Sequence, residues 1–197
     1  MSHDTRAQQR LHHFEQLYAA SPDPWQVRDS WYEQRKRAIV LASLHRPRYR
    51  KVYEPGCGNG EMSAALAARC DRLLAVDGVA SAVAAARARL AGLPGCTVAQ
   101  ANLPADWPQD QFDLIVISEL AYYFEGADLQ ALADAAARSL APGGMLLLCH
   151  WRHDFDDRAS STDVAHATFG AAPGLLPSLR HLERDFLLEA WCRQETP

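Results

Sequence analysis

One stretch decides the fold: Glu54-Pro55-Gly56-Cys57-Gly58-Asn59-Gly60, which stands between a short apolar strand at residues 52–54 and a helix-forming run at 61–69. A strand, a tight glycine turn and a helix N-terminus together bring unpaired backbone N–H groups up to a bound ligand. Gly56 and Gly58 carry no Cβ that would block this close approach or forbid a positive φ. The stretch therefore predicts a ligand site at the carboxyl end of the first strand.

The spacing of the glycines and the acid before them indicate which ligand binds. The pattern E-x-G-x-G-x-G differs from the dinucleotide pattern G-x-G-x-x-G, which argues against a nicotinamide oxidoreductase. A carboxylate at Glu54 would repel a pyrophosphate and attract a cationic nucleoside. S-adenosylmethionine has both an ammonium and a sulfonium, so we expect it as the cofactor and S-adenosylhomocysteine as the product. A glycine-rich turn without a ligand is the alternative.

Composition limits the remaining classes. The 197 residues suit one domain, and 48% hydrophobic and 22% charged residues are ordinary for a globular protein. We expect no membrane partner, because no apolar run approaches the roughly 20 residues that a spanning helix needs. Five scattered cysteines indicate reduced thiols and a cytoplasmic location. The net charge of −4 argues against nucleic acid, although residues 35–51 carry several basic side chains and no acid, as an RNA footprint or a solvated face would.

Strand and helix patterns alternate along the chain with short connections. We expect strands at residues 52–54, 72–77, 96–101, 112–118, 145–150, 178–184 and 186–193, and helices at 6–20, 31–44, 61–69, 79–91, 128–140 and 163–169. This alternation predicts an α/β fold, a Rossmann-like, doubly wound and mostly parallel seven-stranded sheet. The last two strands are joined too tightly for a helical crossover, so we expect a C-terminal hairpin with one antiparallel strand. Residues 1–45 are expected to form a helical lid over a core at 46–197.

In such sheets, ligands lie at the carboxyl ends of the strands. Asp77 ends the second strand, where it could accept both ribose hydroxyls. Asn102 could bond the adenine edge and Leu103 could cover its face, or the pair could belong to an ordinary turn before a proline. Arg35 or Arg28 could pair with the methionine carboxylate, because an Arg fork suits carboxylates. The predicted cofactor-binding residues are Glu54, Gly56, Gly58, Gly60, Asp77, Gly78, Asn102, Leu103, Ser118, Trp31 and Arg35.

The ends of the fourth and fifth strands should face the reacting centre. Glu119 could hold or deprotonate an amine, His150 is the other candidate base, and Tyr122 could line the methyl-transfer channel. A structural role is the alternative for each. The predicted substrate-binding residues are Tyr123, Trp151, Arg152, Trp25 and Tyr32. The acids and histidines at residues 150–157 match no metal-ligand set, so we expect no metal there.

These residues together resemble the class I S-adenosylmethionine-dependent methyltransferases. The resemblance rests on Glu54–Gly60, Asp77, the strand and acid at residues 112–119, and Leu140-Ala141-Pro142-Gly143-Gly144. Within that superfamily the chain is similar to the nodulation protein S family through Asp23-Pro24-Trp25, Trp31-Tyr32-Glu33-Gln34-Arg35-Lys36, Ser118-Glu119 with Tyr122-Tyr123, His150-Trp151-Arg152 and Asp185-Phe186-Leu187-Leu188. That resemblance implies N-methylation of the free amine of a deacetylated chitooligosaccharide. Asn102 departs from the pattern, because many methyltransferases carry Asp at this position.

The sequence therefore predicts an S-adenosylmethionine-dependent N-methyltransferase of a small-molecule or oligosaccharide amine, as a monomer or weak homodimer. An O-, S- or RNA-directed methyltransferase and a non-catalytic cofactor-binding module remain alternatives.

Overall fold

The structure is a computed structural model that describes residues 3–194, with the side chains of residue 8 and of residues 10–194. Its helices are α1 (His3–Ala20), α2 (Trp31–Ala42), α3 (Glu61–Ala67), α4 (Ala80–Arg89), α5 (Gly126–Ser139) and α6 (Thr162–Gly170), with a 3-10 turn η1 (Ala121–Tyr123). Its strands are β1 (Tyr49–Pro55), β2 (Cys70–Asp77), β3 (Cys96–Gln100), β4 (Phe112–Ser118), β5 (Leu140–Trp151), β6 (Leu175–Leu182) and β7 (Phe186–Arg193).

The strands form one seven-stranded sheet in the order β3-β2-β1-β4-β5-β7-β6. Strands β1 to β5 pair in parallel, while β7 runs antiparallel to both β5 and β6. The predicted fold class, including the C-terminal hairpin, is confirmed. The strand order reverses between β1 and β4, and their carboxyl ends leave the crevice in which open α/β sheets bind ligands.

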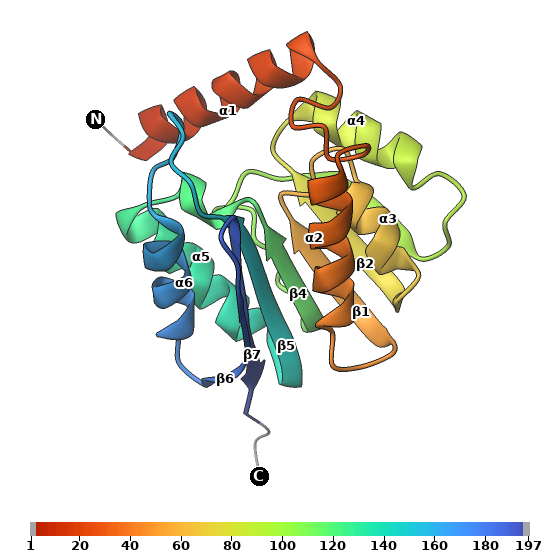
Figure 1. The fold of residues 1–197 in the computed structure, drawn as a ribbon, viewed down its shortest axis with the longest axis vertical. Helices are drawn as coiled ribbons and strands as arrows, with labels where there is room; N and C mark the ends of the chain where they lie inside the picture. Colours follow the sequence, from red (N-terminus) through yellow and green to blue (C-terminus); the bar gives the residue numbers. More distant parts are fainter. Residues whose placement is uncertain (1–2, 195–197) are drawn as a thin grey trace.

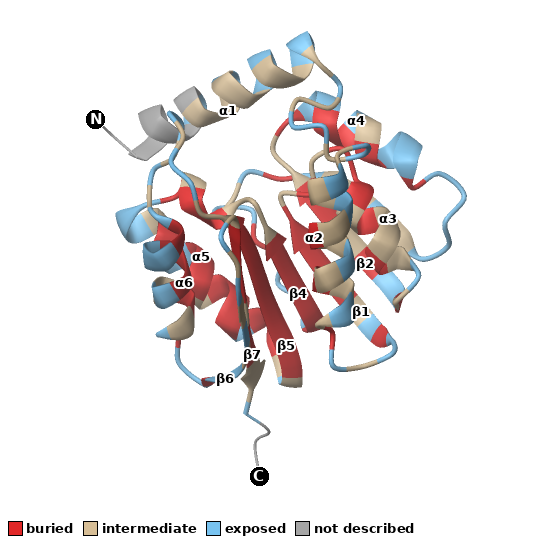
Figure 2. Ribbon diagram, in the orientation of Figure 1, coloured by how far each residue is buried: buried red, intermediate tan, exposed pale blue. Residues whose placement is uncertain are grey.

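Strand β4 explains why helices cover both faces of the sheet. Leu114 and Val116 pack into a core with α2 and α3, whereas Ile115 and Ile117 pack into a second core with α5 and α6. All four side chains are fully buried, because successive residues of a strand point to opposite faces. Each such side chain contributes about 1.5–3 kcal/mol relative to exposure. Figure 2 shows the central strands as the buried middle of the molecule.

The two N-terminal helices lie in different places. Helix α1 crosses the edge of the sheet at which the parallel strands end (Figure 1). Helix α2 instead packs on the sheet through Val40, which is fully buried in the same core as Leu114. The part that covers the crevice is therefore α1 with the loop that follows it, and α2 belongs to the helical layer.

Two strands begin earlier than their apolar patterns predict. Strand β1 begins at Tyr49, whose side chain is 2% exposed and is followed by the exposed Arg50. Strand β5 begins at Leu140 and includes the Pro-Gly-Gly segment. Two basic residues of β1 and the loop before it form ion pairs with acids: Arg48 with Asp71 at 2.6 Å and Lys51 with Asp110 at 2.8 Å. Within residues 3–194 no helix is both long and apolar enough to cross a membrane.

Candidate active site

The glycine loop joins β1 to α3 in a conformation that only glycine adopts without strain. Gly56, Gly58 and Gly60 have φ values of 72°, 53° and 84°. The backbone N–H groups of Gly56 and Cys57 both donate to the Val76 carbonyl, at 2.8 and 2.9 Å. The loop is thus tied to β2, and its open side faces the crevice.

Two carboxylates border this loop. Asp77 accepts hydrogen bonds from the Gly58 N–H at 2.9 Å and the Val79 N–H at 3.0 Å, one on each oxygen. These bonds orient the carboxylate and leave further lone pairs for hydroxyl donors. Burial raises the pKa of Asp77, against the effect of the backbone N–H groups.

Glu54 is the second carboxylate. It is 3% exposed and accepts a hydrogen bond from the Ser63 hydroxyl. Burial raises the pKa of Glu54 to about 8, the hydroxyl opposes that shift, and the charge of Asp77 adds to it. A buried acid with this pKa gains a stable charge when a cation binds beside it. The pair thus fits a ligand with hydroxyls at one end and a positive charge at the other.

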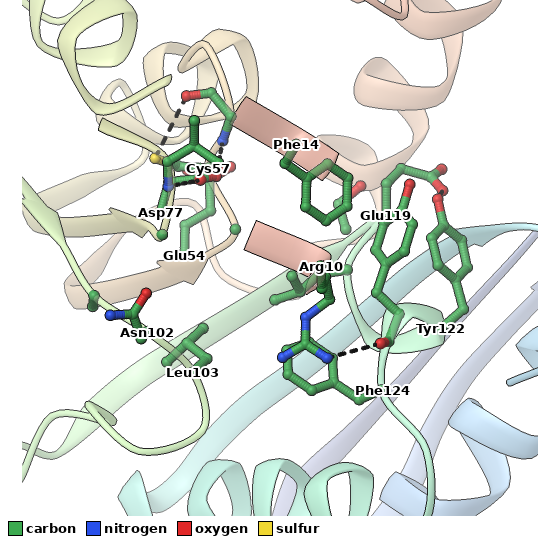
Figure 3. A pocket seen from close by; sticks show the side chains of 18 of the residues that line it. Arg10, Phe14, Glu54, Cys57, Asp77, Asn102, Leu103, Glu119, Tyr122 and Phe124 are labelled. Carbon is green, nitrogen blue, oxygen red and sulfur yellow. Dashed lines mark hydrogen bonds between the residues drawn. The ribbon is translucent and has the colours of Figure 1, made fainter. Parts of the chain in front are cut away.

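A cavity of ≈ 1470 Å³ extends from these carboxylates, larger than the roughly 300–1,000 Å³ of common ligand pockets. Figure 3 shows Glu54 and Asp77 on one side, Glu119 and Tyr122 on the other, and Phe14 of α1 between them. The sequence-predicted residues that line it are Glu54, Gly56, Gly58, Asp77, Gly78, Asn102, Leu103, Ser118, Glu119, Tyr122, Tyr123, Trp151, Trp25 and Tyr32. The cavity has room for a second molecule beside a nucleoside.

Glu119 follows β4 and holds an unusual backbone conformation, with φ 52°. A non-glycine residue at positive φ costs energy and persists when its surroundings hold it. Its carboxylate receives the Tyr122 hydroxyl and the Trp151 N–H on Oε2. The Lys36 ammonium contacts Oε1 at 2.6 Å. These three donors fix the carboxylate at the end of the sheet.

The sequence did not predict that Lys36 and Glu33 take part in the site. Lys36 is 2% exposed, and its Nζ contacts Glu33 Oε1 at 2.8 Å as well as Glu119. Burial lowers the pKa of Lys36, but the two carboxylates outweigh burial and raise it overall. Burial raises the pKa of Glu33, with the ammonium opposing. The spacing i, i+3 on a helix places Glu33 and Lys36 together, but only the fold brings Glu119 to them.

Aromatic rings form much of the remaining wall. Phe14 meets Tyr123 edge to face at a centroid distance of 4.8 Å, and Tyr18 meets Trp25 at 5.7 Å. Phe14 and Tyr18 come from α1, which belongs to the segment expected to form a helical lid, and their i, i+4 spacing places them on one face of that helix. Tyr32 meets Trp151 in the same way at 5.1 Å.

His150 lies elsewhere than predicted. It is fully buried and does not line the cavity. Its Nε2 accepts the Ala121 N–H at 2.9 Å, and its Nδ1 is 3.0 Å from His166 Nε2. Burial and the neighbouring His166 hold the pKa of His150 well below its ordinary value. Both ring nitrogens are therefore engaged inside the protein, and the structure gives His150 no path to a substrate.

Four other predicted residues also lie off the cavity wall. Arg35 forms two bonds of 2.7 Å to the Glu183 carboxylate, and Arg152 donates to the Glu183 carbonyl at 2.9 Å. Trp31, at the start of α2, is 75% exposed. Gly60 is the N-cap residue of α3. Both Arg side chains hold the turn between β6 and β7, and Arg35 does so across 148 positions, which no local pattern could reveal. The alternative, Arg28, is bonded to Glu61 at 2.9 Å.

Comparison with known proteins supports the geometry. A family model described as a methyltransferase domain matches residues 52–144. A candidate methyltransferase from Pseudomonas syringae is 49% identical, and its crystal structure superposes with a TM-score of 0.74 over 83% of this chain and 100% of that one. Nodulation protein S of Rhizobium tropici is 30% identical over 130 residues, 65% of this chain, which thus spans 55% of that relative.

A further neighbour shows the same fold at lower identity. The crystal structure of the N-methyltransferase NodS from Bradyrhizobium japonicum WM9, in complex with S-adenosyl-L-homocysteine, superposes with a TM-score of 0.82 at 23% identity, covering 96% of this chain and 100% of that one. Given this strand order and near-half identity over the whole of a relative, the chain belongs to the class I S-adenosylmethionine-dependent methyltransferases.

Proposed function

We propose that the protein transfers a methyl group to the amine of a small molecule or amino sugar. The observation that carries this proposal is the wall opposite the glycine loop, where the carboxylates Glu33 and Glu119 share one ammonium, Lys36. Both carboxylates rely on this one buried ammonium, because the guanidinium of Arg37, which also lines the cavity, donates to the Val27 carbonyl, and we infer that they favour a cationic acceptor over an anionic one. The aromatic rings around it also favour a cation through their faces.

S-adenosylmethionine, when bound, supplies the electrophilic methyl group. Asp77 would hold the ribose hydroxyls, and Glu54 would face the ammonium of the methionine part. Asn102 and Leu103 would border the adenine. The protein's main contribution to the rate is alignment, because holding two reactants in line removes most of the entropic barrier.

The size of the cavity supports an acceptor larger than a simple amine. Trp25 is 44% exposed at the cavity edge, and Trp151 and Tyr32 form a second aromatic surface. Flat aromatic side chains present large apolar faces with a polar edge, which suits the alternating faces of a sugar ring. The nodulation protein S relatives and the N-methyltransferase among the structural neighbours add weight to an amino-sugar acceptor.

The test is a product scan by mass spectrometry with labelled S-adenosylmethionine. The acceptors are glucosamine oligomers, simple primary amines, and matched hydroxyl and carboxylate compounds. We expect labelled N-methyl product from amines, with oligomers preferred over the monomer. Asp77→Ala is the control for cofactor-dependent signal. Product only from hydroxyls or carboxylates, or cofactor binding without any turnover, would refute the proposal.

A further inference from the structure

The two carboxylates that flank Lys36 differ in what remains free on them. Both oxygens of Glu119 are occupied by protein donors, one by the ammonium and the other by Tyr122 and Trp151. Glu33 receives Lys36 on Oε1, and among the described residues no donor reaches Oε2. Glu33 also lines the cavity, with its side chain 17% exposed. It therefore has an oxygen to offer a ligand, whereas Glu119 is held by the protein.

A cation from outside would complete this cluster. Lys36 cannot neutralise two carboxylates, and its burial removes the water that would otherwise screen them. The hydroxyl of Tyr32, on the same helix, is buried and has no hydrogen-bond partner among the described residues. Its ring lies 5.0 Å from the Lys36 ammonium. A charged nitrogen entering from the cavity would meet the unused carboxylate oxygen of Glu33.

We propose that Glu33 is the catalytic carboxylate that binds the acceptor's ammonium and takes its proton, an inference that rests on the proposed N-methyl transfer. The ammonium passes one proton to Glu33 Oε2, leaving a neutral amine and a carboxylic acid. The nitrogen lone pair then forms the N–C bond while the C–S bond breaks, with its electron pair going to sulfur. The methylated ammonium carries the positive charge away, and Glu33 releases its proton to solvent through the cavity.

Glu119 acts through its neighbours in this scheme and is a positioning residue. Its carboxylate aims Lys36 at Glu33 and holds the Tyr122 hydroxyl. The raised pKa of Glu33 suits a proton acceptor better than an ordinary carboxylate. The charged and titratable groups that face Glu33 are Lys36, Arg37 and Tyr32 of α2, Glu119 after β4, and Cys149 of β5.

The experiment compares Glu33→Gln, Glu33→Asp and wild type on whichever amine the product scan identifies. Asp29→Asn is the matched control, because Asp29 is exposed four positions earlier and loses the same charge. Calorimetry with S-adenosylhomocysteine first checks that each variant binds the cofactor product within about twofold of wild type. At about pH 6.5 we expect Glu33→Gln to lose about 100-fold or more in kcat/KM, with partial recovery in Glu33→Asp.

The pH profile separates proton transfer from a structural role. As the pH rises toward about 9, a growing fraction of the amine is already neutral in solution and depends less on the carboxylate. The deficit of Glu33→Gln should therefore shrink with rising pH, while a packing defect would give a constant ratio. A constant ratio, or activity equal to wild type, overturns the role of Glu33 and leaves the N-methyltransferase standing. A wild-type enzyme that methylates no amine overturns both.

Discussion

We expect the buried carboxylate of Glu54 to make cofactor binding depend on pH. Its pKa of about 8 in the free protein means that it holds a proton at neutral pH. The ammonium of a bound S-adenosylmethionine stabilises the carboxylate form, so binding must release that proton. If the bound state is fully ionised, lowering the pH from about 7.5 to about 6.0 weakens binding about 24-fold, or about 1.9 kcal/mol.

Isothermal titration calorimetry in buffers of different ionisation enthalpy measures both the affinity and the proton release. We expect close to one proton released at about pH 6.5. At about pH 6.5 the cofactor's own ammonium is almost fully charged, because α-amino groups titrate near 7.7–8.0, and the 24-fold figure is the contribution of Glu54 alone. Glu54→Gln is the control and should bind more weakly but with a flat pH dependence. Proton release near zero in wild type, or the same slope in Glu54→Gln, would refute the reasoning.

The same proton also affects the stability of the fold. Binding of the cofactor favours the ionised form of Glu54, whereas folding favours the protonated form. The pKa of Glu54 is raised on folding from its ordinary value of 4.5 to about 8, so the folded state binds the proton more tightly than the unfolded state. The stability that Glu54 contributes is therefore greatest at acidic pH, and it is lost progressively as the pH rises through the unfolded and folded pKa values. Glu54→Gln should raise the Tm of the cofactor-free protein at about pH 8, although it harms binding.

Three further predictions address the rest of the site. Asp77→Ala should weaken S-adenosylmethionine binding more than about tenfold by calorimetry, because two ribose hydroxyls lose an oriented acceptor; wild-type affinity would exclude that role. Lys36→Met should lower the free energy of unfolding in urea by about 3–5 kcal/mol, since buried carboxylates lose their cation, and adding Glu33→Gln should restore part of it. Gly60→Ala should cost about 1–3 kcal/mol more than its φ alone explains, because the new Cβ would meet the α4 backbone at 3.0 Å. Gly92→Ala, at a similar φ of 83° with open space around it, is the matched control, and equal losses in the two variants would contradict the steric argument.

The positions of Glu54 and Asp77 at the cavity were predictable because they depend on local turns. Glu54 and Asp77 each lie near the carboxyl end of a strand, beside the glycine loop. Their position in the sequence, at the end of a predicted strand, therefore also predicted their position in the fold. His150 shows where this logic fails. It is the last residue but one of β5, but its side chain shares the face of Leu146 and Leu148, and therefore lies under α6 against His166. A position at the end of a strand predicts that a residue lies at the ligand-binding edge of the sheet. The alternation of side chains along the strand then decides whether its side chain reaches the ligand.

The ion cluster around Lys36 could not be predicted because its contacts join distant segments. Lys36 belongs to the basic run at residues 35–51, which from the sequence could be an RNA footprint or a solvated face. Nothing in that run indicates a contact with an acid 83 positions later. Burial of the Lys36 ammonium also contradicts the usual exposure of lysine, and is tolerated only because two carboxylates surround it. Arg35, one position earlier, points the other way and holds Glu183.

This division has a consequence for specificity. The family model covers residues 52–144, which include both cofactor carboxylates and Glu119. Glu33, Lys36 and Trp151 lie outside it, on α2 and at the end of β5. The carboxylate of Glu119, which follows β4, could thus take part in sites for many acceptors, provided that other elements supply the side chains that recognise each acceptor. In the proposed mechanism those groups are a shared ammonium and an unused carboxylate oxygen, which would select a positively charged nitrogen. Replacing α2 alone would change the charge of the acceptor wall while leaving the glycine loop and Asp77 in place.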